Sequence, residues 1–342
     1  MIEIPFSNGN SYKLKNTWEE LSADEYKAVL KFIVQHQNEE ITLHQLRLQV
    51  FFLLSGLRPR LNRNPDKADL QAENITRMAH QMCFMMRVDY ENTKSFSNLS
   101  KASRGLLEHY LPSELDQTPE VRWADKAVKT IRPDLVFARN LIPTIGRRRH
   151  ILNGYIFEVK DRILTTSLTT AQFIDAQTIC TEIEQSGSES LLNLLVAILY
   201  MPLLASGSNA PRPPQWYNAQ EASQEAKQLD WLDPETKKAI YINFNAIQTY
   251  LCTRTKYAIL FNAPATTETV KKPKHNLGLG SMAYSLMKSG YGDIENSNLV
   301  KFFEIMYSDL VTNVMTLHKQ GHPIDKIAEM TGLTIFKINQ IL

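Results

Sequence analysis

A short pattern that occurs twice decides the fold of this chain: residues 21–26 read LSADEY, and residues 168–173, 147 positions further on, read LTTAQF. In each copy a hydroxyl residue, Ser22 or Thr169, precedes a Glu or Gln by three positions. This spacing is typical of a capping box, in which the hydroxyl and the longer side chain satisfy backbone N–H groups at the start of a helix. The pattern therefore predicts two capped amphipathic helices.

Similar elements flank each copy in the same order. Residues 1–15 alternate between apolar and polar side chains around an Asn-Gly pair, which predicts a tight β-hairpin, and residues 154–164 alternate as a strand. Residues 46–54 and 191–201 each supply a second apolar helix. We interpret the recurrence as a duplicated hairpin–helix–helix unit, and the alternative is convergence of unrelated segments on a common capping pattern.

Other local signals fall within and after the first of these units. Thr42 is expected to cap its second helix and Gly56 to end it. Residues 75–87 then place four methionines at helical spacing. This spacing predicts either the buried face of a helix or a face that binds a partner.

The predicted fold class is mainly α with small β-hairpins (α+β), in which the duplicated unit is followed by a helical C-terminal region. We expect three parts. Residues 1–121 form a hairpin plus helical unit, residues 122–204 the second hairpin–helix–helix unit, and residues 217–342 the helical C-terminal region ending in a helix-turn-helix-like hairpin. Connectors are expected at residues 205–216 and 263–276.

Composition indicates an ordinary globular protein, because 43% of the 342 residues are hydrophobic and 22% are charged. Three widely spaced cysteines do not make a disulfide framework or a zinc site. The apolar run at residues 191–204 is shorter than a bilayer requires, and the first residues lack the pattern of a secretory signal. We therefore expect a cytoplasmic protein with no membrane partner.

The formal net charge of +2 conceals a strong segregation. Ten basic and four acidic residues give +6 over residues 122–162, whereas two basic and nine acidic residues give −7 over residues 165–235. The densest cationic spot is Arg147, Arg148, Arg149 and His150, predicted to be a loop at or before the second hairpin. These side chains can contact a polyanion, pair with an acidic protein surface, or lie in a solvated loop.

No pattern in the sequence predicts catalysis. His318 and His322 have a spacing that could hold a metal ion on one helix, but Gly321 and Pro323 interrupt that helix. The Gly-Leu-Gly at residues 278–280 has neither the third glycine nor the preceding strand of a dinucleotide-binding turn. We therefore expect no catalytic residues, no cofactor, no metal site and no enzymatic activity.

The last residues, 323–342, read PIDKIAEMTGLTIFKINQIL and predict two short helices joined at Gly332. Ala328 is small where two helices would touch, and the residues expected to form the core of this hairpin are Ile327, Leu333, Ile338 and Ile341. The spacing is similar to that of a helix-turn-helix.

The outward positions of these two helices are the candidate contacts with DNA or a protein partner: Lys326, Thr334, Lys337, Asn339 and Gln340. A DNA reader needs polar and basic side chains at the start of its second helix, but Ile335 and Phe336 occupy those positions. Two interpretations of the hairpin therefore remain. In the first it closes the C-terminal region or docks a protein partner, and in the second it binds DNA.

Several stretches carry a resemblance to a known group of proteins. The hairpin followed by TWEELS at residues 17–22, the segments at residues 169–176 and 194–202 (LLVAILYMP), and the terminal helical turns at residues 324–333 cover about a quarter of the chain. Together they resemble uncharacterised tail-module and structural-operon proteins of tailed bacteriophages and prophages, including tail-assembly-chaperone-like proteins.

The resemblance implies a non-enzymatic assembly or virion-associated protein in the host cytoplasm or the particle. Its implied partners are other phage structural or assembly proteins, with self-association as a further form of contact, and it carries over no active-site residues. The alternative is a DNA-binding regulator or packaging factor that uses residues 147–149 and the helix-turn-helix-like segment, with nucleic acid as the partner.

Overall fold

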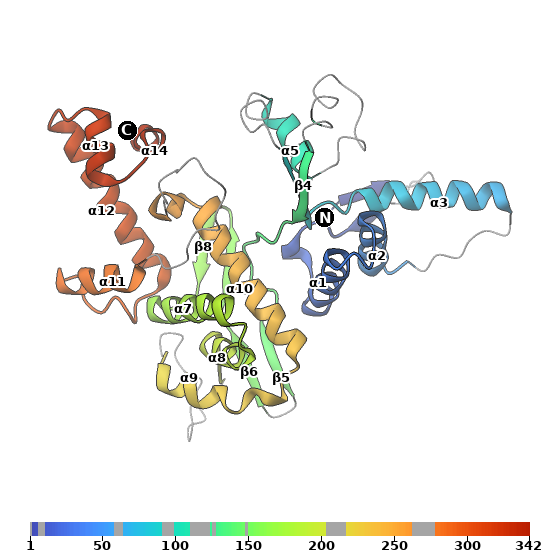
Figure 1. Ribbon diagram of the computed structural model, residues 1–342, viewed down its shortest axis with the longest axis horizontal. Coiled ribbons are helices and arrows are strands. Elements are labelled where there is room, and N and C mark those ends of the chain that lie inside the picture. Colours follow the sequence, from blue (N-terminus) through green and yellow to red (C-terminus); the bar gives the residue numbers. More distant parts are fainter. Residues whose placement is uncertain are drawn as a thin grey trace. The chain divides into compact units, whose positions relative to one another are not determined.

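In the computed structural model the protein forms two compact units, unit 1 over Met1–Leu135 and unit 2 over Val136–Leu342 (Figure 1). Each unit is considered by itself. The structure describes residues 2–5, 11–57, 64–90, 99–109, 124, 128–147, 150–202, 217–261 and 278–342. The connectors expected at residues 205–216 and 263–276 lie outside this part of the chain.

Unit 1 contains helices and two pairs of antiparallel strands, β1 with β2 and β3 with β4. In chain order its elements are β1 (Ile2–Pro5), β2 (Ser11–Leu14), η1 (Trp18–Glu20), α1 (Ala23–Gln37), α2 (Leu43–Ser55), α3 (Pro65–His80), β3 (Met86–Tyr90), α5 (Lys101–His109) and β4 (Val128–Pro133).

Unit 2 contains a three-stranded antiparallel sheet, β5-β6-β9, and a separate hairpin, β7–β8. Its elements are β5 (Thr144–Arg147), β6 (His150–Gly154), β7 (Phe157–Lys160), β8 (Ile163–Thr166), α7 (Thr170–Ser186), α8 (Glu189–Leu199), β9 (Tyr200–Pro202), α9 (Ala219–Ala226), η3 (Leu229–Trp231), α10 (Pro234–Arg254), η4 (Lys256–Phe261), α11 (Leu279–Lys288), α12 (Leu299–Lys319), α13 (Ile324–Thr331) and α14 (Ile335–Ile341).

These elements confirm the predicted class, mainly α with small antiparallel sheets. Among the described residues, no helix is both long enough and apolar enough to cross a lipid bilayer.

The predicted helix caps form in unit 1. The Ser22 hydroxyl accepts a hydrogen bond from the Glu25 backbone N–H at 3.3 Å, and the Glu25 carboxylate accepts one from the Ser22 N–H at 2.7 Å. Thr42 begins α2 in the same way, and Gly56 ends it with a φ of 65°. Each contact joins residues close in sequence, which explains why the pattern predicts it.

Only half of the predicted box forms at the second copy. The Thr169 hydroxyl accepts a hydrogen bond from the Gln172 N–H at 3.1 Å, but the Gln172 side-chain amide donates to the Ile198 carbonyl at 2.7 Å. That carbonyl belongs to the last turn of α8, where helical carbonyls lack an intrahelical partner. Gln172 therefore joins α7 to α8 instead of completing the box.

Three expected element boundaries are wrong. The strand expected over residues 154–164 is instead the end of β6 followed by the β7–β8 hairpin, whose turn contains two residues of positive φ. The helix expected over residues 191–201 ends at Leu199, because β9 pairs with β6. The methionine segment at residues 75–87 leaves the helix after His80, although Met82, Met85 and Met86 are buried as a core face would be.

The order hairpin, helix, helix does occur twice, as β1–β2, α1, α2 and as β7–β8, α7, α8. The second occurrence shares its core with the helices that follow it. Phe173 of α7 lies 5.6 Å from the Phe244 ring of α10 and 5.9 Å from the Phe303 ring of α12, between ring centroids. The Asn298 side chain also donates to the Thr166 carbonyl at 2.6 Å.

The sequence pattern predicts two separate parts after residue 121, at residues 122–204 and 217–342. In the structure, the chain from Val136 to Leu342 forms one compact unit. The boundary of unit 1 follows Leu135, because β4 pairs with β3 and belongs with the first part of the chain. The expected boundary between residues 121 and 122 lies outside the described residues.

Candidate functional site

The predicted C-terminal helical hairpin consists of α13 and α14 and packs on α12. Gly332 follows α13 with a φ of 69°. Because glycine adopts this conformation without the steric cost that other residues incur, the chain can turn there. On the inner side, Ile327, Leu333 and Ile338 are buried against Val314 and neighbouring apolar residues. The predicted core of the hairpin is confirmed, with Ile341 partly buried at its edge.

The outer side of the hairpin exposes large apolar side chains. Phe336 is 70% exposed, Met330 56% and Ile335 48%. These residues lie at the end of α13 and the start of α14, on either side of the turn. Such apolar exposure is typical of a surface that contacts another protein.

The polar candidates of the hairpin divide into two groups. Lys326, Asn339 and Gln340 are exposed, and Thr334 is half-buried. Lys337 is also half-buried: its Nζ donates to the Ala258 carbonyl of η4 at 3.4 Å, and burial lowers the pKa of its ammonium group. The Lys337 side chain therefore contacts η4 of the same unit, a placement that helical periodicity does not predict.

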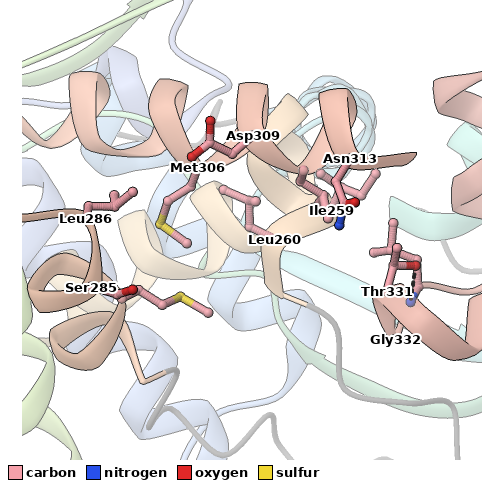
Figure 2. A pocket seen from close by; sticks show the side chains of 12 residues that line it. Ile259, Leu260, Ser285, Leu286, Met306, Asp309, Asn313, Thr331 and Gly332 are labelled. Atoms are coloured by element: carbon pink, nitrogen blue, oxygen red, sulfur yellow. Dashed lines mark hydrogen bonds between the residues drawn. The ribbon is translucent and has the colours of Figure 1, made fainter. Parts of the chain in front are cut away.

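A groove of about 700 Å³ lies beside this hairpin and was not expected from the sequence. Its walls come from η4, α11 and α12, and the turn after α13 forms one end. In Figure 2, Thr331 and Gly332 lie at the opposite end from Ser285 and Leu286. Helix periodicity could have predicted an apolar face on α11 and another on α12, but it could not have predicted that the two faces line one groove.

The chemistry of the groove is mainly apolar. Leu260, Met282, Met306 and Leu310 line it, and Figure 2 shows the Met306 side chain between α12 and the helices opposite. Its lining contains one carboxylate, Asp309, and no basic residue. Flexible methionine side chains adapt to apolar partners of different shape.

The cationic spot lies elsewhere in unit 2. Arg147 and His150 are paired opposite each other at the end of the β5–β6 hairpin, and Arg148 and Arg149 between them lie outside the described residues. In Figure 1, β5 and β6 lie apart from α13 and α14. The structure therefore does not bring the two sets of candidate contacts together.

The described cysteines and the two histidines of the sequence pattern are placed as follows. Burial raises the pKa of the Cys252 thiol to about 12, and burial with the nearby Glu184 charge raises that of Cys180, so both stay protonated at neutral pH. His318 lies in the last turn of α12 and His322 beyond its end. No group of three or more His, Cys, Asp or Glu residues that could hold a metal ion occurs in the described ranges.

Comparison of the chain with protein-family models, with curated proteins and with solved structures found no match.

Proposed function

We propose that this chain is a non-enzymatic phage or prophage assembly or virion-associated protein that acts through protein–protein contacts, like a tail-assembly chaperone. The phage context rests on the resemblance of residues 17–22, 169–176, 194–202 and 324–333 described above. The observation that carries the contact role is the exposed apolar surface of the C-terminal hairpin, formed by Met330, Ile335 and Phe336.

Two features favour a protein over DNA as the partner of this surface. A DNA-reading helix presents polar and basic groups to base edges, whereas the first two residues of α14, Ile335 and Phe336, are apolar and exposed, Phe336 by 70%. The Lys337 ammonium contacts η4, and the adjacent groove has no basic lining residue. An apolar segment of a structural protein fits this chemistry better than a phosphate backbone does.

The test is affinity purification of the tagged chain from phage-producing cells, with mass spectrometry of the proteins that copurify. The chain is expected to retain tail or head proteins, and Phe336→Ser is expected to reduce their recovery severalfold. Leu70→Ser is the matched control, since Leu70 on α3 is 59% exposed in unit 1. A monomer that retains no tail or head protein, or a Phe336→Ser variant that retains the same amounts, would contradict the proposal.

The second candidate is a DNA-binding regulator or packaging factor, favoured by the position of Arg147 and His150 at a hairpin end with two further arginines between them. Three phosphate contacts predict that the logarithm of the binding constant falls by about 3 per tenfold rise in salt. Duplex binding measured by fluorescence anisotropy tests this, and binding that is absent at low salt or unchanged at high salt excludes it.

A further inference from the structure

A second cavity in unit 2 has a different chemistry from the apolar groove. Its volume is about 650 Å³, within the range of small-molecule sites. It lies where the turn of the β7–β8 hairpin, the end of α10, the start of η4 and the first turns of α12 meet. Three cations line it, Arg162, Arg254 and Lys256, against one carboxylate, Glu304.

The carboxylate is already compensated by its neighbours. Lys256 Nζ lies 2.6 Å from Glu304 Oε1, and the Tyr257 hydroxyl donates to the same oxygen at 2.7 Å. Burial opposes ionisation of Glu304, but these two donors outweigh it and hold its pKa below the ordinary value. The ionised Glu304 is therefore held by Lys256 and Tyr257, and the lining contains two further basic side chains, Arg162 and Arg254.

The backbone at Arg162 is the most informative feature of the cavity. Asp161 and Arg162 form the two-residue turn between β7 and β8 with φ values of 50° and 66°. Such turns favour Asn-Gly, because glycine lacks the Cβ that crowds the backbone at positive φ and asparagine tolerates this conformation better than most residues. The end of α10 favours basic residues such as Arg254 by its helix dipole, but that effect does not account for an arginine in a strained turn. Strain of this kind is characteristic of functional positions.

We propose that this cavity binds a small phosphate-bearing ligand. The planar guanidinium groups of Arg162 and Arg254 present forked donors that match phosphate oxygens, and they reach the cavity from two elements distant in sequence. Tyr250 and the apolar wall from Val300 would surround the remainder of the ligand. The site is independent of the hairpin surface and of the proposed assembly role.

The test is isothermal titration of the full chain with inorganic pyrophosphate at low salt. Arg162→Gly is the decisive variant, because glycine adopts the turn without strain while the guanidinium is lost. Its thermal midpoint is expected to equal or exceed that of the parent chain, with pyrophosphate bound at least about tenfold more weakly. Arg254→Gln is expected to weaken binding to a similar extent.

Lys238→Gln is the matched control, since it removes one positive charge from the same helix roughly 24 Å from Arg254. This variant is expected to bind pyrophosphate like the parent chain. ATP bound more tightly than pyrophosphate would identify a nucleotide ligand, and equal binding would identify the phosphate group alone. Absence of pyrophosphate binding, an unchanged affinity in Arg162→Gly, equal weakening by Lys238→Gln, or citrate bound as tightly as pyrophosphate would each overturn the proposal.

Discussion

Replacement of Phe303 by alanine is expected to destabilise unit 2 as a whole, including its hairpin–helix–helix portion. Phe303 lies on α12 and is fully buried. Its ring centroid lies 5.9 Å from that of Phe173 on α7, 5.4 Å from that of Tyr257 and 5.5 Å from that of Phe261. One side chain therefore joins the two parts that the sequence pattern separates.

The expected loss is about 3–5 kcal/mol of the free energy of unfolding of unit 2, the usual range for removing a buried phenylalanine. The upper half of that range is expected, because pairs of aromatic rings contribute about 0.5–1.5 kcal/mol beyond their buried area. Phe336→Ala makes the same chemical change at a side chain that is 70% exposed. It is expected to change the free energy of unfolding by about 0.5 kcal/mol or less.

The assay combines urea unfolding with hydrogen exchange measured by mass spectrometry. In Phe303→Ala, amide protection should fall together in α7, α8 and α12, because these helices share one core. Loss of protection confined to α11–α14, with α7 and α8 unchanged, would refute the assignment of one compact unit and support separate parts.

Three further outcomes are expected. Gly154→Ala should lower the thermal midpoint of unit 2 by several degrees, since an added Cβ would lie 2.8 Å from the Tyr200 ring; an unchanged scanning-calorimetry midpoint would contradict the packing. Burial opposes ionisation of Glu25, but hydrogen bonds from donors that include Lys15 outweigh it and lower the pKa of this carboxyl group. The ionised Glu25 therefore stabilises folded unit 1 fully above pH 4.5, and this stabilisation is lost as the pH falls through the lowered pKa. Glu25→Gln should therefore reduce the acid sensitivity of unit 1 in urea titrations at pH 3–5, and an unchanged pH dependence would exclude this role. Cys252 should resist iodoacetamide at pH 8 until the chain unfolds, because its thiol pKa is about 12, and rapid labelling of the folded chain would disprove this.

Local features of the fold could be predicted because their interactions connect neighbouring residues. The cap at Ser22, the helix end at Gly56 and the turn at Gly332 each depend on a few consecutive positions. The core of the C-terminal hairpin also follows from periodicity, since Ile327 and Ile338 recur on inward faces. The candidate surface at Phe336 could be predicted in part, because the sequence places apolar residues at the start of the last helix, where a DNA-binding helix would have polar ones.

Positions whose partner is distant in sequence could not be predicted in this way. Gln172 has the right spacing for a capping box, yet its amide donates to the Ile198 carbonyl, 26 residues away. Lys337 looks like a surface contact, yet it donates to the Ala258 carbonyl of η4. The cavity at Arg162 depends on segments that no local pattern relates to one another.

The sequence by itself determined the helical class, the caps, the turns and the inward face of the last two helices, because those depend on backbone geometry within a few residues. Only the tertiary structure decided that the second hairpin–helix–helix segment and the C-terminal helices form one unit. It also decided which basic residues line a cavity and which pack against the protein. The physical reason is that burial and charge depend on which elements meet, and rings such as those of Phe173 and Phe303 meet across 130 residues of chain.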